Sequence, residues 1–572
     1  MHAAPPRRRL AFGTRRRWLC AAIVGGSVAY PVFSGEGATR AGALRRAADA
    51  LDRVLLVGMG DSLTHGTMDA TNNQVASQNA YLQKVADKLR EATRLRFRQP
   101  FYDIDEKRLQ PWSVPTNLGV DGADVFSIDG LRYHKRAGTT ENVPTTDFLA
   151  EKKWPFQLQD DYDKVLFPIN LLAGRPVSQI DAAVWQMTQG AQLARSQKAL
   201  GILWIGNNDS SGAALGTGGS PERQPIPFDQ IASELPRGLR LLMRFGQRTG
   251  QVSFEPYTQA SIESVLTEAT DFDAQFNHVL DRLTTETAGS VAEVHWLVVT
   301  LPYYSAVGYL MDSDDLEYYL RKFDPAYTVP ASFKRVAPAG QPIVDATQGD
   351  RVALLTFGFM VSLMATGHTV AEVNDVLEGP DGLQRDGMVL SEAEQQFIMA
   401  RIDSYNAAIQ AAAAGHPNVH VVDVGGTLNA VLTGQVPVIV DGHEISRKWT
   451  RGGSFSLDGV HPGYLGQIFI ANLLLQEIGT RFGWSLTPYD LSQARAADPY
   501  VDHDGDGWSV GPPQAAAGFA ELLSVLTDPD DTDPAVEAQV PADIWDRIAA
   551  LLIGQFRLNA RMAREADRLG LP

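Results

Sequence analysis

The sequence predicts an α/β fold with a mostly parallel five-stranded sheet. Short apolar, β-branched runs recur along the chain, and amphipathic helical patterns lie between them. Strands that alternate with helices favour parallel pairing, because a parallel pair needs a crossover connection. Pro115 lies inside the second predicted strand, where it cannot donate to a ladder. The predicted strands are RVLLVG at 53–58, SVPTNLG at 113–119, GILWIG at 201–206, VHWLVVTLP at 294–302 and VHVVDV at 419–424.

Three helical patterns separate or follow these strands. Residues 80–93 are amphipathic, and residues 463–483 are apolar enough to pack against a sheet. The pattern at 391–415 opens with Ser391 and Glu394 in capping-box spacing and ends at a glycine. The remaining connections are unusually long, and we expect insertions that either shape a site or pack as helices on the outside. These insertions are 125–200, 210–290 and 303–390.

Composition indicates a globular, acidic protein. The 572 residues are 44% hydrophobic and 20% charged, and the formal net charge is −17. Residues 1–34 hold six arginines and no acid, so without them 44 basic residues face 67 acidic ones, a net charge of −23. A body this acidic is repelled by nucleic acid and by anionic membrane surfaces, so neither is an expected partner.

The first 40 residues are predicted to be a signal peptide and linker. An arginine-rich start precedes a modest apolar stretch with small residues, and TRRRWL at 14–19 resembles the twin-arginine export motif. A disordered basic tail is the alternative. We therefore expect an exported protein. Removal of this leader would take away Cys20, the only cysteine, and with it any thiol chemistry. The apolar run 352–367 is too short and mixed to predict a membrane span.

Residues 490–572 form a predicted acidic C-terminal extension that ends in a helical pattern from about 541. Its DHDGDGW motif places carboxylates at alternate positions, followed by Gly507, like the first half of a calcium loop. Pro513 stands where such a loop has its closing glutamate. The motif is therefore consistent with two interpretations, a structural Ca²⁺ site and a solvated acidic turn. The candidate ligands are Asp502, Asp504 and Asp506.

Ser62 is the candidate nucleophile. It follows a predicted buried strand in VLLVGMGDSLTHG, so it lies at the carboxyl edge of the sheet, where open parallel sheets place their sites. Leu63 and Thr64 break the dinucleotide-loop and α/β-hydrolase patterns, respectively. A serine in this position is also a common helix cap.

His461 is the candidate base, because Asp458 stands three residues before it in SLDGVHPG. A carboxylate there can hold the imidazole in the tautomer that leaves its other nitrogen free to take the serine proton. Asn208, in GNND after the third strand, and Gly122, in NLGVDGAD, are candidate donors to an oxyanion. Turn formation is the alternative for Asn208 and Gly122, and a loop pair of no consequence for Asp458 and His461.

Together these four stretches resemble the ordered blocks of the GDSL, or SGNH, hydrolase family. They are GDSL at 60–63, GVDGA around Gly122, GNND with Asn208, and DGVHP with Asp458 and His461. The resemblance covers a catalytic domain at 50–485 and departs from the family in its long insertions and C-terminal extension. It implies a flavodoxin-like three-layer α/β/α sandwich and hydrolysis of carboxylic esters.

The implied mechanism is acyl transfer by Ser62, His461 and Asp458 through an acyl-enzyme. The implied oxyanion donors are the N–H groups of Ser62 and Gly122 and the Asn208 amide, and no cofactor is needed for catalysis. Apolar insertions at 164–172 and 352–366 favour lipids or other apolar acyl esters as substrates. The alternatives are a carbohydrate O-acetylesterase of the same fold and a non-catalytic, calcium-stabilised surface binding protein.

Overall fold

The structure is a computed structural model. It describes residues 51–512 apart from 70, 104–106, 136–144, 153–160, 216–261, 264, 339–340, 344, 366, 380, 385–387, 504, 506, 508 and 510–511. The predicted leader, most of the C-terminal extension, and the calcium candidates Asp504 and Asp506 therefore lie outside the described residues.

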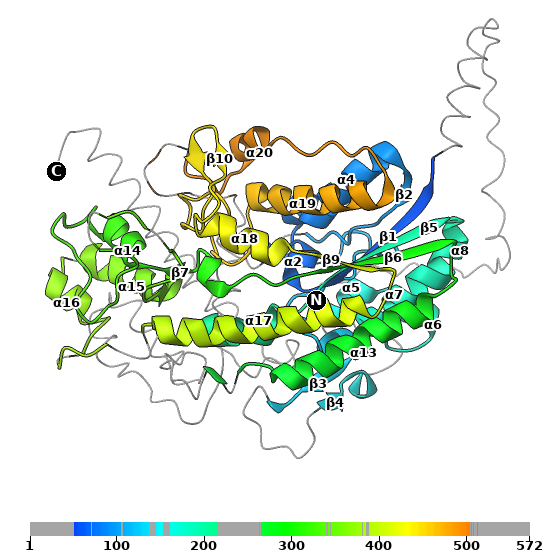
Figure 1. Cartoon of the computed structure of the whole chain (residues 1–572), viewed down its shortest axis with the longest axis horizontal. Coiled ribbons are helices and arrows are strands. Elements are labelled where there is room, and N and C mark those ends of the chain that lie inside the picture. The colour runs from blue at the N-terminus through cyan, green and yellow to red at the C-terminus, as the bar shows by residue number, and fades with distance from the viewer. Residues whose placement is uncertain are drawn as a thin grey trace, which may run out of the picture. The chain divides into compact units, whose positions relative to one another are not determined.

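A five-stranded, all-parallel sheet organises the described chain, which confirms the predicted α/β class (Figure 1). Its first strand, β1, lies between β2 and β5 and is buried over nearly its whole length, as its unbroken apolar sequence predicts. The strands, in spatial order, are β2 (Arg94–Arg96), β1 (Arg53–Gly60), β5 (Lys198–Trp204), β6 (Glu293–Val299) and β9 (Val419–Val422).

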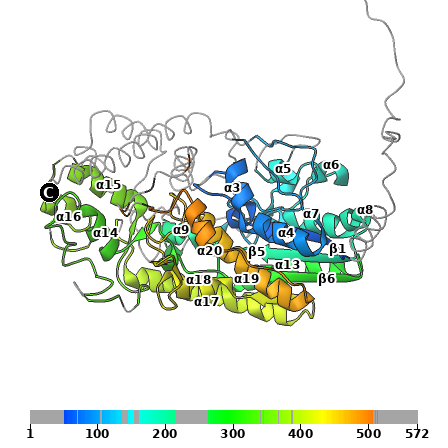
Figure 2. The ribbon, with the colours of Figure 1, turned by 90° about the horizontal axis from the view of Figure 1, so that it is seen from above.

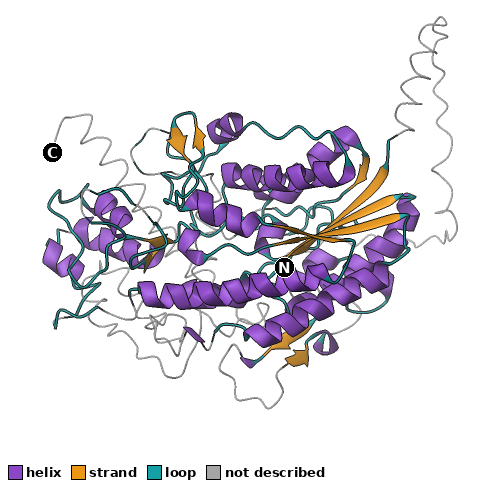
Figure 3. Cartoon of the chain, in the orientation of Figure 1, coloured by secondary structure: helices purple, strands orange, loops and turns teal. Residues whose placement is uncertain are grey.

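Helices cover both faces of this sheet (Figure 3). On one face α4 (Tyr81–Ala92) and α19 (Tyr464–Phe482) lie side by side (Figure 2). On the other face α7 (Gln179–Trp185), α13 (Ala269–Thr287) and α17 (Glu392–Ala414) pack together (Figure 1). The three-layer arrangement follows, because each helix buries its apolar stripe against the sheet.

The three predicted helices are confirmed, with ends that match their sequence signals. The side chain of Ser391 caps α17 in a complete capping box with Glu394. In α4 the buried residues recur with helical spacing, and the basic and acidic residues between them face outward. α7 and α13 show that the segments predicted as insertions also contribute helices to the sheet layers.

The predicted strand at 113–119 is wrong. The segment makes a single parallel bridge from Asn117 to Gly58, supported by backbone hydrogen bonds of Gly58 and Gly60, and it does not extend into a strand. The ladder beside the first residues of β1 belongs to β2, which was not predicted. Pro115 has no N–H to donate, and the short edge strand β2 is half-exposed, so it lacks the apolar run that marks a buried strand. The other four predicted strands are confirmed with ends shifted by a few residues.

The remaining described elements are short. Three two-stranded sheets pair β3 (Leu131–Tyr133) with β4 (Thr145–Asp147), β7 (Leu310–Met311) with β8 (Val352–Ala353), and β10 (Ile439–Val440) with β11 (His443–Glu444). The short helices are α2 (Ser62–His65), α3 (Gln74–Asn79), η1 (Ser127–Asp129), η3 (Leu149–Glu151), α5 (Asp161–Leu166), α6 (Ile169–Ala173), η4 (Gln186–Gly190), α8 (Ala191–Ala194), α9 (Asn208–Leu215), η5 (Tyr304–Ala306), α14 (Ser313–Leu320), α15 (Leu354–Ala365), α16 (Val370–Asn374), α18 (Val424–Leu432) and α20 (Leu491–Ala497).

The apolar run at 352–367 forms β8 and α15, whose Phe357 is fully buried beside Tyr319 and Trp449. Phe357 thus packs in a core between the insertion and the segment near 450. Within the described residues, none of the helices combines the length and apolarity that crossing a bilayer requires.

The first part of the C-terminal extension packs on α19. α20 lies against α19, and the hydroxyl of Thr450 donates to the carbonyl of Gly507. Asp498 accepts a bond from the backbone N–H of Leu465 in the first turn of α19. Asp498 and Gly507 are therefore joined by specific hydrogen bonds to α19 and to the loop of Thr450.

Candidate active site

Ser62 lies at the carboxyl edge of the sheet, on the turn that joins β1 to α2. Asp61, fully buried, caps α2 by accepting from the N–H of Leu63. Gly60 has φ +154, and a Cβ there would overlap the Trp204 carbonyl and the Thr64 side chain. The glycine therefore permits the tight turn that leaves Ser62 half-buried with its hydroxyl directed at His461.

The structure brings Ser62, His461 and Asp458 together although Ser62 and His461 are 399 positions apart. Ser62 Oγ lies 2.9 Å from His461 Nε2, and His461 Nδ1 lies 2.7 Å from Asp458 Oδ2. The other Asp458 oxygen accepts from the backbone N–H groups of Val460 and His461, each at 2.8 Å. Asp458 is fully buried and His461 is 8% exposed, so the carboxylate that orients His461 is shielded from water. Ser62 is only half-buried and remains accessible.

This arrangement can activate a hydroxyl. With a proton on Nδ1 held by Asp458, Nε2 is the acceptor for the proton of Ser62. Burial alone would lower the pKa of His461, but the negative charge of Asp458 and the bond to it outweigh burial and raise that pKa. Burial would raise the pKa of Asp458, and His461 overcomes this and lowers it. Asp458 is thus charged whenever His461 works as a base.

Asn208 and Gly122, the two other candidate residues of this site, lie at the same edge of the sheet. Asn208 begins α9 directly after β5, and its side-chain nitrogen donates to the carbonyl of Ala123 at 3.0 Å. The same bond ties Asn208 to the turn of Gly122, which is exposed and has the left-handed φ of +68. Among the described residues, no atom lies within 4 Å of a Cβ placed on this glycine, so its positive φ explains the residue type.

Several residues that support the site carry no sequence signal. Asn207 donates to Asp61 at 2.8 Å, which links the loop of Asn208 to the turn of Ser62. Asp121, next to Gly122, accepts from Thr67 at 2.7 Å and from Asn72 at 2.6 Å. These bonds join segments that are distant in the chain, so no local spacing could have revealed them.

Two more groups beside the site were not predicted. The side chain of His65 is 2% exposed, and its Nδ1 lies 3.3 Å from Asp121 Oδ1. Asp69 is fully buried and accepts from the N–H of Leu457, one residue before Asp458. Burial, followed by the charge of Asp458, raises the pKa of Asp69 to about 7. Burial likewise raises the pKa of Asp61 to about 6.

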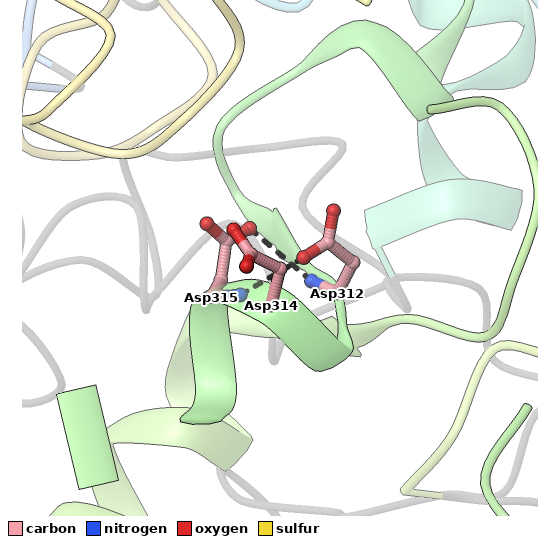
Figure 4. Close-up of side chains that lie close together, drawn as sticks. All are labelled: Asp312, Asp314 and Asp315. Atoms are coloured by element: carbon pink, nitrogen blue, oxygen red, sulfur yellow. Dashed lines mark hydrogen bonds between the residues drawn. The ribbon is translucent and has the colours of Figure 1, made fainter. Parts of the chain in front are cut away.

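A second cluster of acids lies at the start of α14 (Figure 4). Asp312, Asp314 and Asp315 present oxygens within 4.8 Å of one another, a spacing that a metal ion would accept. Basic side chains already bind these carboxylates: Arg447 contacts Asp312 at 2.6 Å and Asp315 at 2.9 Å, and Lys448 reaches all three acids. The cluster is therefore an ion-pair network with its charge already balanced.

Of the predicted calcium ligands, the structure describes Asp502 alone. Its two carboxylate oxygens accept from the N–H groups of Gly505 and Gly507, each at 2.8 Å. Asp502 therefore binds the backbone of two glycines of its own motif. The calcium site stays a prediction, because Asp504 and Asp506 lie outside the described residues.

Comparisons with family models, with curated proteins and with solved structures found no match to this chain. The geometry of the site and the order of its sequence blocks are thus the observations from which function can be argued.

Proposed function

We propose that this protein is a serine ester hydrolase of the GDSL/SGNH type. The observation that carries the proposal is the chain of contacts from Ser62 through His461 to Asp458, at 2.9 and 2.7 Å. A serine that is only a helix cap would need neither a base in hydrogen-bond reach nor a buried carboxylate behind that base. The strand order, which is 2-1-3-4-5 in chain order, also supports the flavodoxin-like arrangement that the family resemblance implies.

In the proposed reaction Ser62 attacks the ester carbonyl while His461 takes its proton. Asp458 stabilises the imidazolium, which then gives its proton to the leaving alcohol. The oxyanion is held by the N–H groups of Ser62 and Gly122 and by the Asn208 amide, which stand at the same edge of the sheet. Water attacks the acyl-enzyme with His461 again as base, and the chain's own residues supply every proton transfer.

The substrate class and location are also proposals. Apolar acyl esters remain the leading substrates, although Phe357 and its neighbours in 352–366 fill the core instead of an open surface. The layout of the first 40 residues supports export. Deacetylation of a carbohydrate and silent surface binding are the competing functions.

The test is hydrolysis of p-nitrophenyl esters from acetyl to palmitoyl, together with labelling by a fluorophosphonate. We expect Ser62→Ala to lose nearly all hydrolysis and all labelling, with an unchanged melting temperature. Peptide mapping should locate the label on Ser62. Full activity in the variant, or a label on another serine, would overturn the proposal.

The ester series also separates the alternatives. A preference for long acyl chains supports apolar esters, and activity confined to acetyl esters supports the carbohydrate O-acetylesterase. If all esters are inert and Ser62 is not labelled, the binding-protein alternative is favoured.

A further inference from the structure

Asp69 connects the loop of Asp458 and His461 to the C-terminal segment. It is fully buried, and its backbone has the left-handed φ of +55. One carboxylate oxygen accepts from the N–H of Leu457 at 2.9 Å, and the other accepts from the hydroxyl of Tyr500 at 2.6 Å. The N–H of Asp69 also donates to Ser456 Oγ at 3.1 Å. Asp69 therefore holds the two residues that directly precede Asp458.

The same two residues are tied to the far end of the loop. The N–H of Ser456 donates to the carbonyl of His461 at 2.8 Å, which closes a short ring around Asp458. Any shift of Asp69 would consequently displace Asp458 and His461 together. A displacement of this kind matters, because a misplacement of about 1 Å in a catalytic group can cost about 10²-fold in rate.

Tyr500 is itself fixed by the helix that follows the loop. It is 1% exposed, and its ring meets Tyr464 of α19 edge-on, with centroids 5.7 Å apart. Asp498 accepts from the N–H groups of both Leu465 and Tyr500, at 2.8 and 2.9 Å. The phenol is thus aimed at Asp69 from a rigid support that begins just after His461.

We propose that Tyr500 is a positioning residue of the ester hydrolase: acting through Asp69, it holds the loop of Asp458 and His461 in its reactive geometry. This inference rests on the proposed function and adds a role for residues 498–500, which the sequence assigned to a separate extension. The hydroxyl of Tyr500 is needed because Asp69 lies close to Asp458. Two carboxylates repel when both are charged, and a strong donor on Asp69 keeps it in place.

The main test compares Tyr500→Phe with a matched control, Tyr489→Phe. Each variant keeps the ring and removes one hydroxyl from the chain that follows α19, but the Tyr489 hydroxyl donates to the Lys84 carbonyl on α4, away from the loop. We expect Tyr500→Phe to lower kcat about tenfold and to leave KM within about twofold, because substrate contacts are unchanged. The control should stay within about twofold of wild type in both constants.

A second variant, Asp69→Asn, tests the link through charge. The amide oxygen can still accept from Leu457, and the amide nitrogen can face the Tyr500 oxygen, so the fold is retained. The titratable groups that face Asp69 are Asp458, His461, Tyr500 and Tyr464. Removal of the Asp69 charge should lower the pKa of His461, so the acid limb of kcat/KM should move to lower pH. A purely structural residue would leave that limb in place.

The possible outcomes separate this inference from the proposed function. If the wild type shows no Ser62-dependent hydrolysis or labelling, the proposed function fails and this inference fails with it. If the wild type is active but Tyr500→Phe matches Tyr489→Phe, or raises KM alone, the positioning role is overturned. Tyr500→Phe could prove too unstable to assay. In that case, a pH profile of kcat/KM whose acid limb is the same in Asp69→Asn as in the wild type overturns the positioning role.

Discussion

Two groups of acidic side chains in this protein are built from the same residue type but differ in their partners. In the described residues around Ser62, four carboxylates gather near two histidines, His65 and His461. At the start of α14, three carboxylates are surrounded by four permanent cations. The first group is Asp61, Asp69, Asp121 and Asp458; the second is Asp312, Asp314 and Asp315 with Arg351, Arg447, Lys448 and Arg451.

The balance of charge determines what each group can do. Burial raises the pKa of Asp61 to about 6 and that of Asp69 to about 7, since no arginine or lysine is bound to either of them in the described structure. Burial also acts on Asp312, but the charges of Lys448, Arg447 and Arg351 overcome it and hold the pKa of that carboxyl well below its usual range. Groups that titrate near neutral pH suit proton transfer, whereas permanently charged pairs mainly hold segments together. The following predictions test that distinction.

The largest expected effect is on activity, at Asp458. Asp458→Asn should lower kcat about 10⁴-fold, because an amide would donate to His461 and favour the wrong tautomer. The amide oxygen can still accept from Val460 and His461, so the melting temperature should change little. The measurement is steady-state hydrolysis with a thermal melt of the same sample. A kcat within tenfold of wild type would remove Asp458 from the mechanism.

The next effect is on stability, at Arg447. Arg447→Met leaves the buried Asp312 and Asp315 without a main partner and should lower the free energy of unfolding by about 3–5 kcal/mol. At assay temperatures well below the melting temperature, the kcat of this variant should stay near the wild-type value. Arg175→Met is the control: Arg175 is 58% exposed in its pair with Asp181, and its loss should cost less than about 1 kcal/mol. Equal losses in denaturant unfolding would show that the cluster is not structural.

Asn208 should show an intermediate effect on turnover. Asn208→Ala should lower kcat by about 10²–10³ and change KM much less, because the amide acts mainly on charge that develops in the transition state. Asn418→Ala is a matched control, since its side chain also donates to one carbonyl, that of Val294. A higher KM at unchanged kcat would assign Asn208 to substrate binding instead.

A third group of acids, at 502–506, has no lysine or arginine in its sequence motif. Calcium at about 100 times its dissociation constant should stabilise the fold by roughly 2.7 kcal/mol, because a cation gathers carboxylates that otherwise repel. Asp504→Ala should lose this shift and keep its activity. The check is the melting temperature with calcium and with chelator. If calcium does not change the melting temperature of the wild type, residues 502–506 form only an acidic turn.

The smallest effect concerns pH. Because His461 must be neutral to act as a base and its pKa is raised from 6.5, kcat/KM should fall as pH drops through a midpoint above 6.5. Asp121 contributes to that rise, so Asp121→Asn should move the midpoint to lower pH. A pH profile of both proteins tests the sign. A midpoint that moves upward would show that Asp121 does not act on His461 through its charge.

Much of the fold was predictable because its signals are local. The buried strands β1, β5 and β6 are continuous apolar runs, and the capping box of α17 lies within four residues. The edge strand β2 was missed because a short, half-exposed strand has no such run, and the segment 113–119 took its place in the prediction.

The sequence by itself identified the candidate site residues whose signals lie within a few positions of each other. Asp458 and His461 are three apart, and Ser62 closely follows its strand. Each of these signals is weak alone, and the order of the four blocks, which resembles the GDSL/SGNH family, selected these residues as candidates. Only the tertiary structure decided which distant residues support them. Tyr500 reaches Asp69 across 431 positions, and Arg447 reaches Asp312 across 135. Such bonds depend on the path of the chain through the sheet layers, and residue type alone leaves that path open.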